Sequence, residues 1–243
     1  MAKRKLKLNK VRILKRVLFA MLPGLIVAGV WGFANPTQKT SITAPVENGL
    51  VGYWKLDENP AIHQTEIRDS SPFGNHGTLS TNNGEENKSV EGKISRALSF
   101  DGVDDYVEVG TGISFGDLTV WTIEAWLYPT GFPGGYAALW GNYSSGGYVM
   151  IWENAVGFER YYPSWWGNVN VGALENCWSH IVLTMDASRQ FKVYRDGVYK
   201  GANTSGESTA IEMKYLGRRQ WQTASWYQGL IDEVRIYNRG FVG

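Results

Sequence analysis

A single carboxylate interrupts an apolar strand pattern near the end of the sequence. Within residues 230–237 (LIDEVRIY), Val234 and Ile236 are apolar and alternate, and Asp232 shares their side because side chains two apart on a strand point the same way. A carboxylate directed into a core is costly unless a charge or several donors neutralise it. The pattern leaves two possibilities open, a network of Arg or backbone N–H donors or a bound hard cation.

Aromatic residues crowd two polar, loop-like stretches, 161–168 (YYPSWWGN) and 219–228 (RQWQTASWYQ). Rings can stack on the apolar C–H faces of sugars, and loops usually lie at the protein surface. The residues expected to bind a sugar are Tyr161, Tyr162, Trp165, Trp166, Trp221, Trp226 and Tyr227. The alternative is that rings such as Trp165 or Trp226 close the ends of the fold.

The carboxylates are poorly placed for hydrolysis of a glycosidic bond, since a retaining glycosidase needs two of them about 5–5.5 Å apart. Glu124 has no acidic neighbour at alternate positions, and Asp232 and Glu233 are adjacent, so they should point to opposite faces. Glu153 and Glu159 could face each other only across a hairpin. No nucleophile-elbow, phosphate-loop or Cys/His motif is present. We therefore expect binding rather than catalysis, with a glycanase as a third alternative.

Many short strands would position these residues. Residues 120–128 alternate apolar and polar side chains, as a half-buried strand does. Glu153-Asn154-Ala155 and Asp196-Gly197 are predicted hairpin turns, the second being a strong two-residue hairpin signal. Turn signals recur every ~8–12 residues, and no helix of three turns is predicted in the domain. This pattern predicts an all-β sandwich or barrel.

The first 47 residues have the pattern of a targeting segment and a linker, not that of a folded domain. Eight basic side chains precede an uncharged stretch, 17–33, and small residues then give the layout of a signal peptide cut after Ala34. The stretch also reaches the length of a short membrane helix, so an uncleaved anchor is the alternative. Both alternatives export the remainder, which would be secreted or held at the cell surface on the extracytoplasmic side. We predict a signal peptide or membrane anchor at 1–34, a Pro-containing linker at 35–47 and one domain at 48–243.

The part after the basic segment is acidic. Residues 35–243 hold 16 basic and 23 acidic side chains, a net charge of −7, although the whole chain is formally +1. An acidic surface repels phosphate backbones, so no nucleic acid is expected as a partner. Cys177 is the only cysteine, which excludes an intrachain disulfide, and no two of the three histidines have the spacing of zinc ligands.

Four groups of segments, taken in order, carry a family pattern. They are 49–58 (GLVGYWKLDE); 69–77 (Asp69-Ser-Ser followed by PFGNHG) with 97–107 (ALSFDGVDDYV); 122–129 (TIEAWLYP) with 178–184 (WSHIVLT) and 193–197 (VYRDG); and 229–239 (GLIDEVRIYNR). Together they resemble the laminin-G-like branch of the concanavalin A-like lectin/glucanase superfamily. The resemblance implies an antiparallel two-sheet jelly-roll sandwich. A fold shared by lectins, glucanases and adhesion modules does not by itself define a function.

The resemblance also implies a calcium site. In the family the first and last strands lie side by side, which would bring Asp57 and Asp232 together, and many relatives carry a structural calcium in this region. Asn75 could add an amide oxygen, and Ca²⁺ prefers carboxylate, amide and carbonyl oxygens. We predict a structural Ca²⁺ held by Asp57, Asn75 and Asp232, with an ion-free hydrogen-bond network as the alternative. The acidic stretch 101–105 (DGVDD) is a second candidate site that is also typical of a solvated turn.

The predicted function is that of an exported, lectin-like module that binds a polysaccharide or glycoconjugate without catalysis. Calcium would stabilise the sandwich rather than contact the sugar. The main alternative is a protein-interaction, adhesion or structural envelope module whose partner is a surface protein. The membrane would be contacted only through residues 17–33, if that segment is not cleaved.

Overall fold

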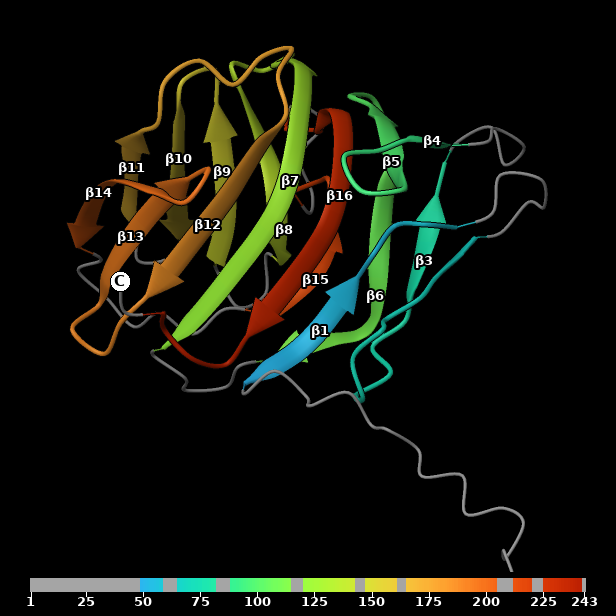
Figure 1. Cartoon of the computed structure of the whole chain (residues 1–243), viewed down its shortest axis with the longest axis horizontal. Coiled ribbons are helices and arrows are strands. Elements are labelled where there is room, and N and C mark those ends of the chain that lie inside the picture. Colours follow the sequence, from blue (N-terminus) through green and yellow to red (C-terminus); the bar gives the residue numbers. More distant parts are fainter. Residues whose placement is uncertain are drawn as a thin grey trace, which may run out of the picture. The chain divides into compact units, whose positions relative to one another are not determined.

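The alternating runs of the sequence form β strands in two antiparallel sheets that lie face to face (Figure 1). The computed structural model describes residues 49–58, 65–81, 88–114, 120–142, 147–160, 165–204, 212–219 and 225–241, within a compact unit bounded by Thr43–Gly243. These residues contain no helix, which confirms the predicted all-β, two-sheet sandwich. The predicted signal or anchor segment and the linker lie outside them.

No membrane-spanning helix, judged by length and apolar character, occurs among the residues that the structure describes.

Sheet A contains the first and last strands of the described chain. Its order is β14-β13-β12-β7-β16-β5-β4, and β1 also pairs with β16. The bounds of its strands are β1 Leu50–Trp54, β4 Ser89–Glu91, β5 Arg96–Asp101, β7 Trp121–Gly131, β12 Ser179–Met185, β13 Gln190–Arg195, β14 Val198–Thr204 and β16 Gln228–Tyr237. The pairing of β1 with β16 confirms that the two ends of the domain lie side by side.

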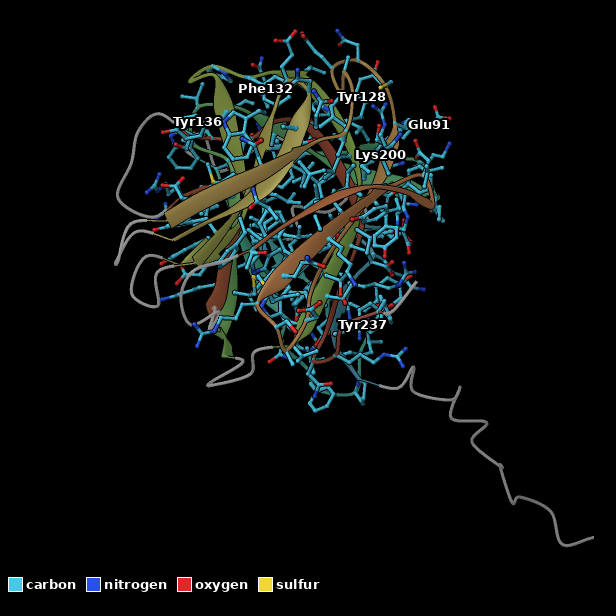
Figure 2. All side chains as sticks on the ribbon, turned by 90° about the vertical axis from the view of Figure 1, so that its left-hand side faces the viewer. Glu91, Tyr128, Phe132, Tyr136, Lys200 and Tyr237 are labelled. Atoms are coloured by element: carbon cyan, nitrogen blue, oxygen red, sulfur yellow. The ribbon has the colours of Figure 1, made fainter. Side chains whose placement is uncertain are left out.

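Sheet B has the order β11-β10-β9-β8-β15-β6-β3-β2. The bounds of its strands are β2 Glu66–Ile67, β3 Gly77–Ser80, β6 Tyr106–Ser114, β8 Tyr136–Asn142, β9 Gly147–Trp152, β10 Ala155–Arg160, β11 Trp165–Asn170 and β15 Glu212–Leu216. In Figure 2, Lys200 of β14 and Tyr136 of β8 lie on opposite sides of the sandwich, one on each sheet.

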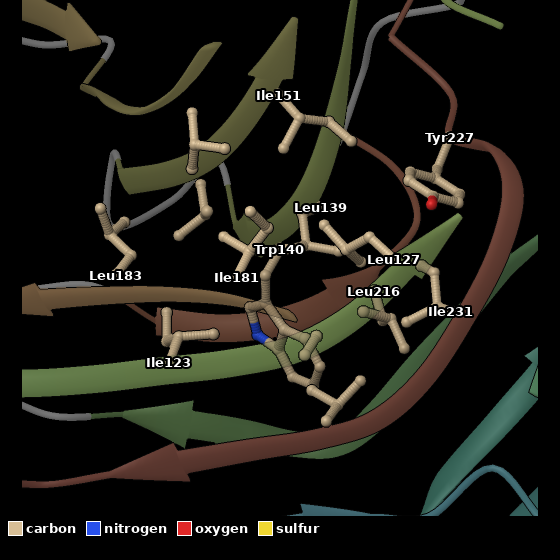
Figure 3. Close-up of a cluster of buried hydrophobic side chains, with 14 of the residues drawn as sticks. Ile123, Leu127, Leu139, Trp140, Ile151, Ile181, Leu183, Leu216, Tyr227 and Ile231 are labelled. Atoms are coloured by element: carbon tan, nitrogen blue, oxygen red, sulfur yellow. The ribbon is translucent and has the colours of Figure 1, made fainter. Parts of the chain in front are cut away.

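The core lies between the two sheets and is made by every second residue of the strands. In β7, Ile123, Ala125 and Leu127 are at most 2% exposed, as the alternation of the sequence predicts. Trp54 of β1 and Trp140 of β8 come from opposite sheets, and their ring centroids lie 5.0 Å apart. Figure 3 shows part of this cluster. Each strand therefore presents a second set of side chains on the outer face of its sheet.

Both predicted hairpins are present. Strands β9 and β10 pair across the turn at residues 153 and 154. Strands β13 and β14 pair across Asp196-Gly197, whose φ angles of 51° and 76° are those of a tight hairpin turn.

Strand β16 changes its neighbour along its length. Residues 228–231 pair with β5, whereas residues 234–237 pair with β1. On the opposite edge, the register with β7 is shifted between Asp232 and Arg235 by a bulge. Glu233 within the bulge has a φ of 54°, a left-handed conformation that is strained for a residue other than glycine. The bulge therefore redirects the two acidic side chains of this strand.

Candidate functional site

A closed network of charges covers part of the outer face of sheet A. We name it the sheet A network: Tyr53, Glu124, His180, Glu233, Arg235 and Tyr237. The Arg235 guanidinium bonds to the Glu233 carboxylate and lies 3.5 Å from Glu124. The Glu124 carboxylate also accepts a 3.0 Å hydrogen bond from the Tyr237 hydroxyl and lies 3.5 Å from His180 Nε2. The Tyr53 hydroxyl donates to Glu233. Each charge of the network therefore has an opposite charge beside it.

Burial shifts the pKa of two members of the network, His180 and Tyr53. It lowers the pKa of His180 even though Glu124 opposes the shift, so the imidazole is neutral at pH 7. Burial and the hydrogen bond to Glu233 raise the pKa of Tyr53, which stays a phenol. The network consequently holds two carboxylates and one guanidinium, and Glu233 is only 4% exposed.

Two aspartates meet where β16 changes partners, as the metal prediction requires. Asp57 follows β1, and its Oδ1 accepts a 2.9 Å hydrogen bond from the Arg96 amide. Asp232 is buried; its Oδ2 accepts a 2.8 Å bond from the Ile94 amide, and its Oδ1 has no hydrogen-bond partner among the described residues. Burial, with lesser contributions from Glu233 and Asp57, raises the pKa of Asp232 to about 6. A cation beside these two carboxylates would supply the missing partner, so both residues fit a calcium site.

Asn75 has other contacts. Its side-chain amide donates to the Val51 carbonyl at 2.9 Å, and its backbone amide donates to Asp69 at 2.8 Å. No contact described in the structure joins Asn75 to Asp57 or Asp232. Asp69, which was not predicted as a site residue, organises this turn through its buried carboxylate, which also accepts from the amides of Tyr53 and Ser71.

The second acidic cluster already contains a cation. Oxygens of Asp101, Asp104 and Asp105 lie within 4.8 Å of one another. However, the buried Lys88 ammonium lies 2.8 Å from Asp105 Oδ2. The Asp101 carboxylate accepts hydrogen bonds from the amides of Val103 and Asp104. These contacts favour a lysine-neutralised turn over a second calcium site.

The outer face of sheet B carries a continuous row of residues across five strands. The register places Glu108 of β6 beside Tyr215 of β15, and Tyr215 beside Gly141 of β8. The row continues through Tyr148 of β9 to Glu159 of β10. Residues directly opposite each other on antiparallel strands share a face. The row therefore combines aromatic rings with two carboxylates on one side of the sandwich.

Three rings surround an arginine on this face. We name this group the aromatic–arginine cluster: Tyr106, Tyr215, Arg218 and Trp226. The guanidinium carbon of Arg218 lies 4.1 Å from the centroid of Tyr106, 4.5 Å from that of Tyr215 and 5.5 Å from that of Trp226. Tyr106 and Trp226 are half-buried, so each also has accessible surface. Cation–π attraction holds the guanidinium among the rings.

Two further cations flank the cluster, and both are paired. Arg219 is 4% exposed and forms a two-pronged contact with Glu159, at 3.1 Å and 3.4 Å. Its guanidinium carbon also lies 4.6 Å from the centroid of the Tyr148 ring. Lys214 lies 3.1 Å from Glu108, and this hydrogen bond raises the pKa of Lys214.

The structure describes only part of the predicted set of sugar-binding residues. Tyr161, Tyr162 and Trp221 lie outside the described residues. Trp165 and Trp166 begin strand β11 rather than lying in a loop, with Trp166 opposite Glu159 in the register, and their side chains are likewise outside the description. Trp226 is part of the aromatic–arginine cluster.

The position of Tyr227 contradicts the prediction that its ring binds a sugar. Its side chain is completely buried, its ring packs edge-on against Phe100 at 5.9 Å, and its hydroxyl donates to the Leu230 carbonyl. Figure 3 shows Tyr227 near Leu127 and Ile231 in the core cluster. The chain pairs Tyr227 with Gly217 through a backbone hydrogen bond, which fixes its ring on the inner side. The ring is therefore unavailable to a ligand.

The structure also places the carboxylate pairs that were considered for catalysis differently from the simple strand alternation assumed for them. Glu159 faces Tyr148 across the β9–β10 hairpin, whereas Glu153 lies in the exposed turn, so the two glutamates are not opposed. Asp232 and Glu233 do not simply alternate, because the left-handed Glu233 and the bulge around it break the period of two. Glu233 belongs to the sheet A network, and Asp232 contacts the turn before β5.

Part of the aromatic–arginine cluster could have been predicted from the alternation of side chains in β6. Val107 and Val109 face the core, so Tyr106 and Glu108 must face outward from β6. Tyr215 could not be assigned in this way, because the register of β15 with β6 shifts between Met213 and Tyr215.

A family model described as the concanavalin A-like lectin/glucanases superfamily matches residues 101–241, more than half of the chain. The chain belongs to this superfamily. Comparison with curated protein sequences finds no significant match.

Solved structures with the same fold include binding domains. Domain 4 of AbnA, an extracellular GH43 arabinanase from Geobacillus stearothermophilus solved with arabinotriose, is 20% identical, with 81% of this chain and 95% of that chain covered and a TM-score of 0.61. The binding domain of botulinum neurotoxin serotype D is 11% identical, with 80% and 49% covered and a TM-score of 0.56. That of neurotoxin DC, solved with rat synaptotagmin II, is 13% identical, with 80% and 49% covered and a TM-score of 0.56. The chain spans about half of each toxin domain, and these identities establish the fold alone.

Proposed function

We propose that this protein is a non-catalytic carbohydrate-binding module that takes its glycan on the outer face of sheet B. The observation that carries the proposal is the aromatic–arginine cluster, in which half-exposed rings of Tyr106 and Trp226 stand beside polar and charged side chains. Rings with apolar faces and a few placed polar groups are what a sugar-binding surface requires. The glycan complex of the arabinanase domain, which matches over 95% of its length, supports the same class of ligand.

The test is a glycan array with the protein expressed from the full-length chain, followed by affinity measurements on the glycans that bind. Trp226→Ala should weaken binding by about tenfold or more, because it removes a stacking surface. Phe73→Ala is the matched control, since it removes a 61% exposed ring from a different turn. Unchanged affinity of a folded Trp226→Ala variant would refute this site.

The absence of catalysis is part of the proposal. Glu124 and Glu233 both contact Arg235, and each is held by a tyrosine hydroxyl as well. Carboxylates whose oxygens are held in contacts within the protein are not positioned to act on a glycosidic bond. The protein should therefore release no reducing sugar from any glycan that it binds.

A second candidate function is protein binding, which the exposed edge of sheet A favours. Among the described strands, β14 pairs only with β13, and its Val198 and Tyr199 are 56% and 53% exposed. Unpaired strand edges can add a strand from a partner. The synaptotagmin complex of the neurotoxin DC domain shows that this fold also serves protein receptors. A blank glycan array together with cell-surface binding that is lost in a Val198→Lys/Tyr199→Lys variant would favour this candidate.

We also propose a structural Ca²⁺ at Asp57 and Asp232. The two carboxylates converge on the turn before β5, and the buried Asp232 Oδ1 without a partner is the observation that supports an ion there. Bound calcium would neutralise both carboxylates and connect the end of β1 to β16 within sheet A.

Export is the remaining part of the proposal. We propose that residues 1–34 act as a signal peptide or anchor, so that the domain works outside the cytoplasm. N-terminal sequencing of the protein recovered from its host would distinguish cleavage after Ala34 from retention of the segment. Recovery from the cytoplasm with Met1 intact would refute both.

A further inference from the structure

Arg218 lacks the acidic partner that neighbouring cations have. Its side chain is half-buried, and its Nε atom is buried without a hydrogen-bond partner among the described residues. Within that part of the chain no carboxylate lies within ion-pair distance of its guanidinium. In contrast, Lys214 and Arg219 on the same face contact Glu108 and Glu159. Arg218 therefore carries a charge that the described protein surface does not neutralise.

The surroundings of Arg218 favour the binding of an anion by its guanidinium. Residues 35–243 are acidic, with a net charge of −7, yet the positive charge of Arg218 lies against aromatic rings and not against a described carboxylate. The rings of Tyr106 and Tyr215 replace part of the water around Arg218 and restrict its position. A restricted, partly desolvated guanidinium gains more from an anion than a solvated one does. Its planar fork also matches a carboxylate, which can accept two parallel hydrogen bonds.

We propose that Arg218 binds the acidic group of an anionic glycan, so that the ligand of the sheet B face contains uronic acid residues. In this arrangement the sugar carboxylate meets the guanidinium, and the half-exposed ring of Trp226, 5.5 Å from Arg218, stacks on the sugar. Strands β6 and β15, which lie side by side in sheet B, hold the rings that position Arg218 (Figure 1). The inference rests on the proposed glycan-binding function and defines the class of glycan.

The test compares acidic polymers with an uncharged counterpart. Polygalacturonate, alginate and hyaluronan supply uronates on different backbones, and fully methyl-esterified polygalacturonate keeps its backbone but lacks the charge. The protein should bind at least one uronate polymer, and esterification of polygalacturonate, where that polymer binds, should weaken binding by at least tenfold. Arg218→Gln should lose the same factor on the acidic polymer and almost nothing on the ester, while Arg218→Lys should restore part of the loss, since it keeps the charge without the fork.

The controls separate a specific contact from general attraction. Lys200→Gln removes one positive charge from the exposed strand β14 and should leave uronate binding unchanged. Dextran sulfate tests whether a sulfate ester can replace the carboxylate. Equal loss of binding in Lys200→Gln and Arg218→Gln, or equal affinity for acid and ester, would overturn the inference. Binding of a neutral glycan that requires Trp226 but not Arg218 would also overturn it and yet leave the proposed function intact. If neither Trp226→Ala nor Arg218→Gln affected the binding of any glycan, both this inference and the proposed glycan site on sheet B would be refuted.

Discussion

Two arginines on the outer faces of the sandwich, Arg235 on sheet A and Arg218 on sheet B, have opposite surroundings. On sheet A, Glu124 and Glu233 share Arg235, and tyrosine hydroxyls complete their hydrogen bonds. On sheet B, Arg218 is surrounded by rings and has no described acidic partner. A network that satisfies itself holds strands together and leaves little affinity for a ligand, whereas an unsatisfied charge among rings can gain from one.

The same contrast occurs between adjacent residues of β16. Glu233 is bonded to Tyr53 and Arg235, whereas one oxygen of the buried Asp232 has no partner among the described residues. We therefore expect Glu233 to contribute to stability directly, whereas at neutral pH Asp232 should do so only with a bound cation.

Breaking the sheet A network should give the largest effect. Glu233→Gln removes one of two carboxylates beside the half-buried Arg235, and the free energy of unfolding should fall by about 3 kcal/mol, as for a buried ion pair that loses one partner. Urea unfolding measures this value. Glu66→Gln, at an exposed position, should cost less than about 0.5 kcal/mol. Reduced glycan affinity in a folded Glu233→Gln variant would contradict the separation of the two faces.

Removal of calcium should have an effect of similar size. With Ca²⁺ at a hundredfold excess over its dissociation constant, EDTA should lower the free energy of unfolding by ~2.7 kcal/mol. Asp232→Asn and Asp57→Asn should abolish this shift, whereas Asp104→Asn should keep it because that cluster already contains Lys88. Thermal unfolding scans measure the shift. Identical melting of the wild type in Ca²⁺ and in EDTA would refute the calcium proposal.

The pH dependence in EDTA should reveal Asp232 itself. Its pKa in the folded protein, about 6, lies above its ordinary value of 3.8, so the favourable contribution of the protonated form is present below pH 3.8 and is lost as pH rises through 6. Relative to Asp232→Asn, the wild type should therefore lose about 2–3 kcal/mol between about pH 4 and about pH 7. Added Ca²⁺ should remove this loss. A difference that does not vary with pH would show that the carboxyl titrates normally.

The smallest expected effect is a difference in stability between variants that affect the two neighbouring arginines of sheet B, Arg218 and Arg219. Glu159→Gln weakens the ion pair between Glu159 and Arg219, which is 4% exposed, and should cost about 1–2 kcal/mol of stability. Arg218→Gln should cost less, because Arg218 has no described acid to leave behind. Parallel urea titrations measure the difference. A larger loss for Arg218→Gln than for Glu159→Gln would mean that Arg218 is primarily a packing residue.

The sandwich was predictable because its signals are local. The alternation in 120–128 and the Asp196-Gly197 turn depend on side chains a few residues apart, and the structure confirms both. The approach of Asp57 to Asp232 was also predictable, since the family places the first strand beside the last. Asn75 was assigned to the same site because its turn can present an amide oxygen; its side-chain NH2 group donates to the Val51 carbonyl, and ligation by its oxygen stays a prediction.

The residues of the proposed binding face were less predictable, because two residues that are adjacent in the sequence can lie on opposite sides of a sheet. Trp226 and Tyr227 belong to the same aromatic stretch, yet one lies in the outer cluster and the other is completely buried. Their composition is equally aromatic, and only the path of the chain beside β8, fixed by backbone hydrogen bonds at Ala138 and Leu139, distinguishes them.

The sequence by itself determined the strand periodicity, the hairpin turns, the acidic balance of residues 35–243 and the membership of the superfamily, because each depends on residue types or on order along the chain. Only the tertiary structure decided which charges are matched. Glu124 meets Arg235 from a strand far away in the sequence, and Arg218 meets rings from β6 and β15 but no described acid. Such pairings depend on register and on bulges, which shift a side chain from one face to the other by a single residue.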